Sequence, residues 1–189
     1  MDSTQAVIDE IFDLYERYGK ADYIGEPVSQ IEHMSQSAQL AIEGGYDDEV
    51  VLAAFFHDIG HICVQATNEQ SMADFGVKSH EKIGADFLRT KGFPERVAKL
   101  VENHVQAKRY LTHKFPSYFE QLSEASRKTL EFQGGVMSKQ EAEAFEYDTL
   151  FDLSILLRKW DEKAKKTHVP LIGMELLKEK CRVVLSHSL

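Results

Sequence analysis

Two histidines and an aspartate interrupt an apolar segment of the chain, the stretch VLAAFFHDIGHICV at residues 51–64. His57, Asp58 and His61 directly follow residues that favour a buried helix, so their side chains should lie against the core rather than in solvent. A buried polar or charged group is strongly destabilising unless it is paired or binds a metal. The stretch therefore predicts that these side chains share a buried partner.

Further titratable side chains fall on or near the apolar faces of expected helices. His104 lies three or four residues beyond Leu100 and Val101, on the inward face of one helix. His33 lies at the apolar edge of another helix, and an inward Asp161 would need a cation or a metal. The full candidate metal-ligand set is His33, His57, Asp58, His80, His104 and Asp161.

A set of four imidazoles and two carboxylates is typical of a metal site. One histidine on an apolar face is more often a hydrogen-bonded core residue, but a helical core has no use for this many buried titratable groups. Without thiolates, the donor set fits iron, manganese, zinc or cobalt and does not fit calcium or a structural zinc finger. Six ligands are more than one catalytic ion normally takes, and Asp58 is well placed to bridge two ions.

The elements that must position these residues are helical nearly throughout. Apolar spacing, caps and glycine stops predict helices over residues 4–18, 29–44, 48–60, 79–92, 94–104, 116–135, from 138, 150–163 and beyond 170. Ser29, Asp47, Ser79 and Ser138 are the expected amino-terminal caps. No strand pattern, repeat or low-complexity tract stands out, so we expect an all-α helical bundle forming one domain over residues 1–189.

Composition narrows the partners and the compartment. The 189 residues include 31 acidic and 22 basic side chains, and the net charge of -9 argues against a nucleic-acid-binding surface. No apolar run is long enough to suggest a membrane span. Two cysteines, Cys63 and Cys181, are too few for a disulfide framework, and the amino terminus lacks a signal-peptide pattern. We therefore expect a cytoplasmic protein that acts on a small molecule.

The spacing H…HD…H…H…D, with HDIGH at its centre, resembles the HD-domain superfamily of helical metal-dependent phosphohydrolases and oxygenases. A narrower likeness runs from the first linker to Lys165, in the collinear blocks DYIGEPVSQIEH, VLAAFFHDIGH, HEKIGADFLR, GFPERVAKLVENHVQAKRYL, ASRKTLEFQGG and RKWDEK. These blocks are similar to the mixed-valent diiron HD oxygenases, and most similar to the branch that acts on 2-amino-1-hydroxyethylphosphonate. The region after Thr167 matches least, and no function is assigned to it.

The resemblance implies a cofactor of two iron ions, Fe(II) and Fe(III), that are bridged by Asp58. One iron would also be held by His33, His57 and Asp161, and the other by His80 and His104. The implied reaction joins the substrate (R)-2-amino-1-hydroxyethylphosphonate with O2 and breaks the carbon–phosphorus bond, which gives glycine and phosphate. Tyr23 and Asp58 are then the expected catalytic residues.

The resemblance also implies the substrate contacts, and several make chemical sense on their own. A phosphonate dianion needs cations and hydroxyl donors, and Lys108 and Arg158 each lie one helical turn from an expected metal ligand. The implied substrate-binding set is Tyr23, Glu26, His61, Lys108, Ser126, Thr129 and Arg158. Glu26 would bind the substrate ammonium, and Tyr23 would occupy an iron site until substrate displaces it.

Three classes of function remain open from the sequence. The leading one is the oxygenase, including relatives that act on a trimethylammonium or hydroxymethyl phosphonate, because Glu26 and aromatic residues can also hold a quaternary ammonium. The second is a metal-dependent phosphohydrolase, in which the metals activate water. The third is a noncatalytic sensor, which a lost ligand would favour; none of the six ligands is lost in this sequence.

Overall fold

The chain is all-helical in the computed structural model, which describes residues 3–23, 25–67 and 79–187. Within these ranges the only β contact is an isolated bridge between Asp22 and Ser29. The described residues form eleven helices: α1 Ser3–Tyr18, α2 Gln30–Glu43, α3 Asp48–Phe56, α4 Ile59–Thr67, α5 His80–Thr90, α6 Glu95–Lys114, α7 Pro116–Gln121, α8 Glu124–Phe132, α9 Lys139–Glu146, α10 Phe151–Lys163 and α11 Met174–Ser186. The expectation of an all-α bundle is confirmed.

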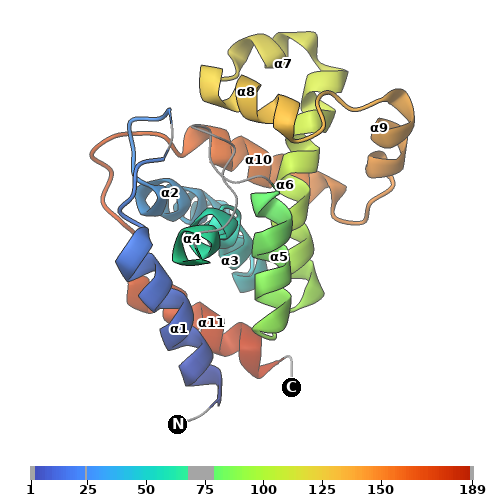
Figure 1. Ribbon diagram of the computed structural model, residues 1–189. Coiled ribbons are helices and arrows are strands. Elements are labelled where there is room, and N and C mark those ends of the chain that lie inside the picture. The colour runs from blue at the N-terminus through green and yellow to red at the C-terminus, as the bar shows by residue number, and fades with distance from the viewer. Residues whose placement is uncertain (1–2, 24, 68–78, 188–189) are drawn as a thin grey trace.

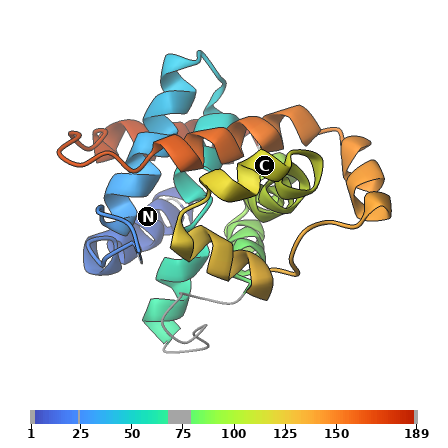
Figure 2. The same ribbon diagram turned by 90° about the horizontal axis from the view of Figure 1, so that it is seen from above.

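The helices pack around a central group formed by α2, α3 and α4 (Figure 1). Helices α5 and α6 lie side by side on one flank, α1 and α11 pair at the end that carries both termini, and α10 crosses behind α6. The short helices α7, α8 and α9 surround the carboxyl half of α6, and the view from above shows α8 beside the central helices (Figure 2). This arrangement gathers segments from across the chain around α3 and α4.

A dense aromatic core supports the centre of the bundle. Tyr15 of α1 stacks on Phe55 of α3 with ring centroids 4.6 Å apart, and its hydroxyl donates to the Phe55 carbonyl at 3.4 Å. Phe56 contacts Phe93 edge to face at 5.4 Å. A second, smaller cluster under α9 is built on Ala107, Tyr110, Leu111, Met137, Ala142 and Phe145. The contacts of Phe55 with Tyr15 and of Phe56 with Phe93 fix α3, and hence the residues that follow it.

The expected amino-terminal caps are mostly confirmed. Ser29 and Ser138 each form a capping box with a glutamate three residues later, and Asp47 accepts a hydrogen bond from the Val50 amide at 3.1 Å. The expectation for Ser79 is wrong, because this residue adopts a left-handed conformation with φ of 59° and its side chain makes no capping hydrogen bond.

Two expected helices are each divided in the structure. The helix expected over residues 48–60 ends at Phe56, and α4 starts at Ile59 after a bend of 50°. The segment expected as one helix over residues 116–135 breaks where Leu122 is extended and Ser123 caps α8. The first break matters for function, because it places His57 and Asp58 at a corner between two helices instead of on one face.

No single helix among the described residues has the length and hydropathy of a membrane-spanning segment. The bent pair Asp48–Phe56 and Ile59–Ala66 reaches that hydropathy only when its two helices are counted together.

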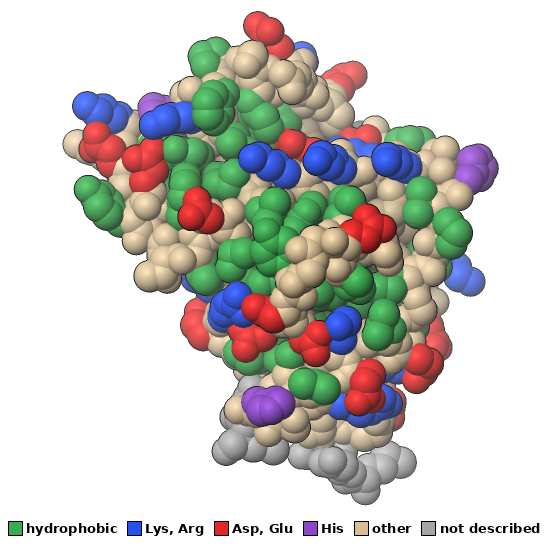
Figure 3. All heavy atoms as spheres, turned by 180° about the vertical axis from the view of Figure 1, so that it is seen from behind, with side chains coloured by type: hydrophobic (Ala, Val, Ile, Leu, Met, Phe, Trp, Pro, Cys, Tyr) green, Lys and Arg blue, Asp and Glu red, His purple; other side chains and the backbone are tan. Residues whose placement is uncertain are grey.

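Seen from behind, the surface carries a central group of hydrophobic side chains below a row of basic ones, with acidic side chains scattered around it (Figure 3). Both charge signs are therefore spread over this face of the molecule.

Candidate functional site

Six buried side chains from distant parts of the sequence converge at the corner between α3 and α4. His33 comes from α2, His80 from α5, His104 from α6 and Asp161 from α10. None is more than 4% exposed: His33, His57, Asp58, His80, His104 and Asp161. The structure thus brings together the whole set that the sequence pattern singled out.

One half of the cluster surrounds the Oδ2 oxygen of Asp58. This oxygen lies 3.3 Å from His57 Nε2 and 3.5 Å from His33 Nε2. The two imidazole nitrogens are 3.0 Å apart, and His33 Nε2 is also 3.3 Å from Asp161 Oδ1. Two imidazoles and two carboxylates therefore face one small volume.

The other half surrounds the Oδ1 oxygen of the same carboxylate. Asp58 Oδ1 lies 3.1 Å from His80 Nε2 and 3.5 Å from His104 Nε2, and these two nitrogens are 3.1 Å apart. His61 is a further neighbour, with Nε2 at 4.0 Å from Asp58 Oδ1 and its ring stacked on His80 at 4.1 Å. Each oxygen of Asp58 thus serves a different group of imidazoles, which is the geometry of a bridging carboxylate.

Backbone hydrogen bonds fix the tautomers of three histidines. The Nδ1 atoms of His33, His57 and His104 lie 2.9, 2.8 and 2.6 Å from the carbonyls of Ala164, Ala54 and Val101, respectively. When Nδ1–H donates to a carbonyl, Nε2 of the neutral ring carries a lone pair. The facing Nε2 atoms then repel each other unless a proton or a metal ion lies between them.

The carboxylates also favour a bound cation. Asp58 Oδ2 and Asp161 Oδ1 are buried with no hydrogen-bond partner in the described part of the chain. Burial raises the pKa of Asp161, but Arg158 and His33 outweigh this and hold it well below its usual value, so the group is charged. Burial lowers the pKa of His33, yet the nearby carboxylates of Asp161 and Asp58 outweigh this and raise it to about 9. Such a site attracts positive charge, and the buried histidines and aspartates can hold metal.

A pocket opens from the second half of the cluster. It is lined by Tyr23, Glu26, Gln30, Asp58, His61, His80, His104, Val105, Lys108, Ala125, Ser126, Thr129, Gln133, Arg158 and Asp161. Every expected substrate contact is in this lining. The pocket therefore joins the histidine and aspartate cluster to α8, to the loop around Tyr23 and to the basic side chains of α6 and α10.

Lys108 and α8 form one wall of the pocket. Lys108 is only 4% exposed, so it is not a solvated surface lysine. Its Nζ donates to Thr129 Oγ1 at 3.0 Å and to the Ser126 carbonyl at 3.4 Å. Burial, with a smaller contribution from Arg158, lowers the pKa of Lys108 to about 7. This wall can present an ammonium and hydroxyl groups to an anion.

Arg158 has three partners, and one of its donor atoms remains available for a ligand. It pairs with Asp161, its Nε donates to Tyr118 Oη at 2.9 Å, and Glu162 lies 3.3 Å away. Tyr118 in turn donates to Glu162. The Nη2 atom of Arg158 is buried with no hydrogen-bond partner in the described residues. A guanidinium fixed in this way offers a directed donor for an anion in the pocket.

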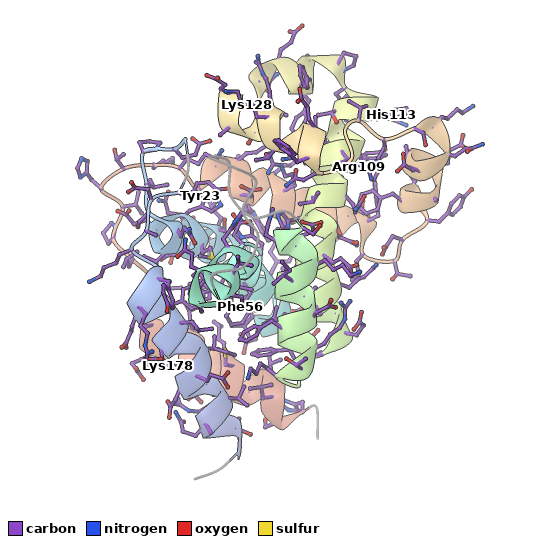
Figure 4. All side chains as sticks on the ribbon, viewed as in Figure 1. Tyr23, Phe56, Arg109, His113, Lys128 and Lys178 are labelled. Carbon is purple, nitrogen blue, oxygen red and sulfur yellow. The ribbon has the colours of Figure 1, made fainter. Side chains whose placement is uncertain are left out.

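Tyr23 and Glu26 belong to a tight turn that covers the cluster. The Tyr23 ring stacks on His33 with centroids 4.1 Å apart, and the Glu26 amide donates to the Tyr23 carbonyl at 2.9 Å. Burial, followed by Asp58 and Asp161, raises the pKa of the Tyr23 phenol well above its usual value. Figure 4 shows Tyr23 next to α2, below the segment of α8 that carries Lys128. The turn thus lies between the cluster and α8.

Sequence reasoning missed four residues at or near the pocket. Gln30 and Gln133 line it, and each has a buried Oε1 with no hydrogen-bond partner among the described residues. Tyr118 orients Arg158 from a short helix, and no sequence pattern indicates that contact. Lys165 pairs with Glu26; its position four residues after Asp161 was the one available hint.

The sequence of this chain is similar to one protein family and to several known proteins. Residues 31–142 match the HD domain family. An uncharacterized protein, L432, of Acanthamoeba polyphaga mimivirus is 46% identical over 158 residues, which cover 84% of this chain and 72% of the relative. A 1-hydroxy-2-(trimethylamino)ethylphosphonate dioxygenase that forms glycine betaine, from Leisingera caerulea, is 38% identical, over 85% of this chain and 81% of the relative. A hydroxymethylphosphonate dioxygenase of Gimesia maris is 34% identical, with coverages of 96% and 89%.

Proposed function

Because the chain belongs to the HD domain family, we propose that it is a diiron oxygenase that cleaves the carbon–phosphorus bond of a 1-hydroxyphosphonate. The proposed reaction converts (R)-2-amino-1-hydroxyethylphosphonate and O2 to glycine and phosphate. Two relatives of this chain are hydroxyphosphonate dioxygenases that differ from each other in the group on the substrate carbon. The proposed substrate shares their hydroxyphosphonate group and carries a primary ammonium.

The observation that carries the proposal is one pocket with three chemical functions. The pocket is lined by residues of the histidine and aspartate cluster, by the basic and hydroxyl side chains of α6, α8 and α10, and by the carboxylate of Glu26. A hydroxyphosphonate with an ammonium group needs all three. A phosphate monoester would use only the first two, so Glu26 and the Tyr23 cover favour the aminophosphonate.

The donor set fits two iron ions. His33, His57, Asp58 and Asp161 would hold one, and Asp58, His80 and His104 the other; His61 is a neighbour close enough to the second group to join it. Iron held by these residues would supply the redox chemistry that oxidation of C1 by O2 requires. Carboxylate and imidazole ligands are typical of such redox-active iron sites.

The side chains of the pocket would bind and orient the substrate. Arg158 and Lys108 would hold the phosphonate oxygens, with hydroxyl donors from Ser126 and Thr129. Glu26 would fix the other end of the molecule, so that C1 faces the cluster. His61 lies against His80 beside the same volume, and burial, with a further contribution from His80, lowers its pKa to about 3. As a neutral imidazole it can donate or accept one hydrogen bond.

Tyr23 would close the site when no substrate is bound. Its ring already covers His33, and its high pKa keeps the phenol protonated at neutral pH. Substrate binding would move the turn that carries Tyr23 and Glu26. The turn packs closely on α8: a Cβ atom added to Gly25 would lie only 2.6 Å from Ala125 Cβ.

Turnover by the iron-loaded protein tests the proposal. We expect aerobic incubation with (R)-2-amino-1-hydroxyethylphosphonate to yield glycine and phosphate in equal amounts. One O2 should be consumed for each substrate molecule. Faster turnover of the trimethylammonium or hydroxymethyl analogue would assign the chain to a sister oxygenase. Release of phosphate from monoesters without O2 uptake, with manganese or magnesium, would instead support a phosphohydrolase.

Replacing Glu26 with alanine is expected to weaken the binding of substrates that carry an amine and to leave the binding of other phosphonates nearly unchanged. The KM for 2-amino-1-hydroxyethylphosphonate should rise at least about tenfold, because a buried charged partner of the ammonium is lost. The KM for hydroxymethylphosphonate, which has no amine, should change by less than about threefold. Steady-state kinetics with both substrates measure this, and an equal rise for both would show that Glu26 has no role in selecting the amine.

Lys108 is expected to give the reaction a pH dependence. With a pKa of about 7, its ammonium loses its charge as the pH rises through neutrality. The KM for the phosphonate should therefore rise by about three- to tenfold between pH 7 and pH 9, with a smaller change in kcat. The Lys108→Arg variant is the control, because its side chain keeps its charge over this range. Titration of the phosphonate itself affects both proteins equally, so a difference between their pH profiles reports on Lys108. Identical pH profiles for the two proteins would contradict the assigned role.

A further inference from the structure

Glu26 already holds an ammonium group in the structure. Lys165 Nζ lies 2.5 Å from Glu26 Oε1, and the two side chains are only 18% and 10% exposed. The same Nζ lies 5.9 Å from the centroid of the Tyr23 ring. A carboxylate and an aromatic face are the groups that recognise an alkylammonium ligand. Lys165 thus has the same pair of partners that a substrate amine would require.

The main chain around Lys165 is fixed on both sides. The carbonyl of Ala164 lies 2.9 Å from Nδ1 of the cluster residue His33. The backbone of Lys166 pairs in both directions with the Gln36 side chain, at 2.9 and 3.1 Å. The Lys165 backbone is therefore anchored beside the histidine and aspartate cluster, so that only a rotation of its side chain is needed to move the ammonium.

A second cavity next to the pocket offers the ammonium another position. Its lining includes Lys165 and Glu162, and it shares Glu26, Ser126 and Arg158 with the pocket that adjoins the cluster. Glu162 is 29% exposed and carries the charge that a displaced lysine would need. Glu26 thus lies between the two cavities, where either a lysine on one side or a substrate amine on the other can reach it.

We propose that Lys165 is an internal counter-ion that occupies the ammonium subsite of the substrate-free protein and that a substrate amine displaces it from Glu26 toward the second cavity. The proposal rests on the proposed function, because it takes Glu26 as the group that recognises the amine. With a substrate that has no amine, Lys165 remains in place and screens Glu26 from the phosphonate. Lys165 therefore reduces the discrimination between aminated and neutral substrates.

Binding of unreactive ligands tests this role without turnover. The probes are 2-aminoethylphosphonate and ethylphosphonate, which differ in the amine and lack the C1 hydroxyl. Calorimetry on the iron-loaded protein under argon gives the dissociation constant of each. For Lys165→Met, the ratio of the ethylphosphonate constant to the aminoethylphosphonate constant should rise at least about fivefold, because the amine no longer competes with an ion pair.

Two further variants separate the contact from a general effect of charge. Lys163 is exposed at the end of α10, so Lys163→Met removes the same charge two residues away and should leave the ratio within about twofold. In the Glu26→Gln background, Lys165→Met should no longer raise the ratio. An unchanged ratio in Lys165→Met, or an equal change in Lys163→Met, would overturn the proposal; Lys165→Gln is a second neutral variant for the same comparison.

The proposed function and this proposal can fail separately. Absence of O2 uptake by the wild-type protein with all three hydroxyphosphonates would overturn the oxygenase and leave the binding ratio to decide the role of Lys165. Normal turnover with a ratio that does not respond to Lys165→Met would retain the oxygenase and overturn the counter-ion.

Discussion

Replacing Asp58 with asparagine is expected to abolish activity by removing the bridge between the two halves of the cluster. Each carboxylate oxygen faces a different pair of imidazoles, at 3.1 to 3.5 Å. An asparagine keeps the shape but turns one ligand atom into an amide donor and removes the negative charge. Activity should fall more than about a hundredfold, since the loss of even an outer partner of a metal ligand costs about ten- to a hundredfold. Iron content should fall below two ions per chain.

The matched control for this variant is Asp152→Asn, which makes the same chemical change on the exposed side of α10. It should retain iron content and O2 uptake within about twofold, as surface substitutions usually do. Retention of two irons and near wild-type O2 uptake by Asp58→Asn would show that Asp58 does not bridge the metals.

Replacing Gly60 with alanine is expected to destabilise the protein strongly, because Gly60 makes the closest approach to backbone atoms among the described glycines. A Cβ atom at this position would lie 2.0 Å from the His80 carbonyl oxygen and 2.7 Å from its carbon. These are backbone atoms, so α4 and α5 would have to separate. We expect a loss of about 3 kcal/mol in the free energy of unfolding and a fall of about 6 to 12 °C in Tm.

The same change should also reach the cluster, because His80 is the residue that α5 contributes to it. Purified Gly60→Ala should bind the iron near His80 and His104 more weakly, as shown by iron content after dialysis against a chelator. Gly173→Ala is the control, since nothing lies within 4 Å of a Cβ there and its φ of -59° suits any residue. A Tm shift no larger than that of the control would contradict the close approach of α4 to α5.

The fold class and the convergence of the histidine and aspartate cluster could be predicted from the sequence, because both depend on local periodicity. His104 was placed inward by its distance from Leu100 and Val101, and the structure buries it with 3% exposure. The corner at His57 and Asp58 could not be predicted in this way. A helical pattern continues through these residues, whereas the close approach of α4 to α5 at Gly60 is a contact between two helices, which the periodicity within one helix does not encode.

The substrate side of the site was only partly predictable for the same reason. Lys108 and Arg158 lie one turn from His104 and Asp161, so helical spacing directs both toward the pocket. Tyr118 reaches Arg158 from α7, and Lys165 reaches Glu26 across 139 residues of sequence. Contacts of this kind are set by how the helices pack, which no local spacing encodes.

Isotope labelling is the most direct test of the central claim, that this HD domain oxidises a hydroxyphosphonate instead of hydrolysing a phosphate ester. The iron-loaded protein is given (R)-2-amino-1-hydroxyethylphosphonate under oxygen-18 gas in unlabelled water, and the products are analysed by mass spectrometry. The account predicts one labelled oxygen in the carboxylate of glycine. Glycine without label from the gas, or phosphate released with oxygen from water and no O2 consumed, would contradict it.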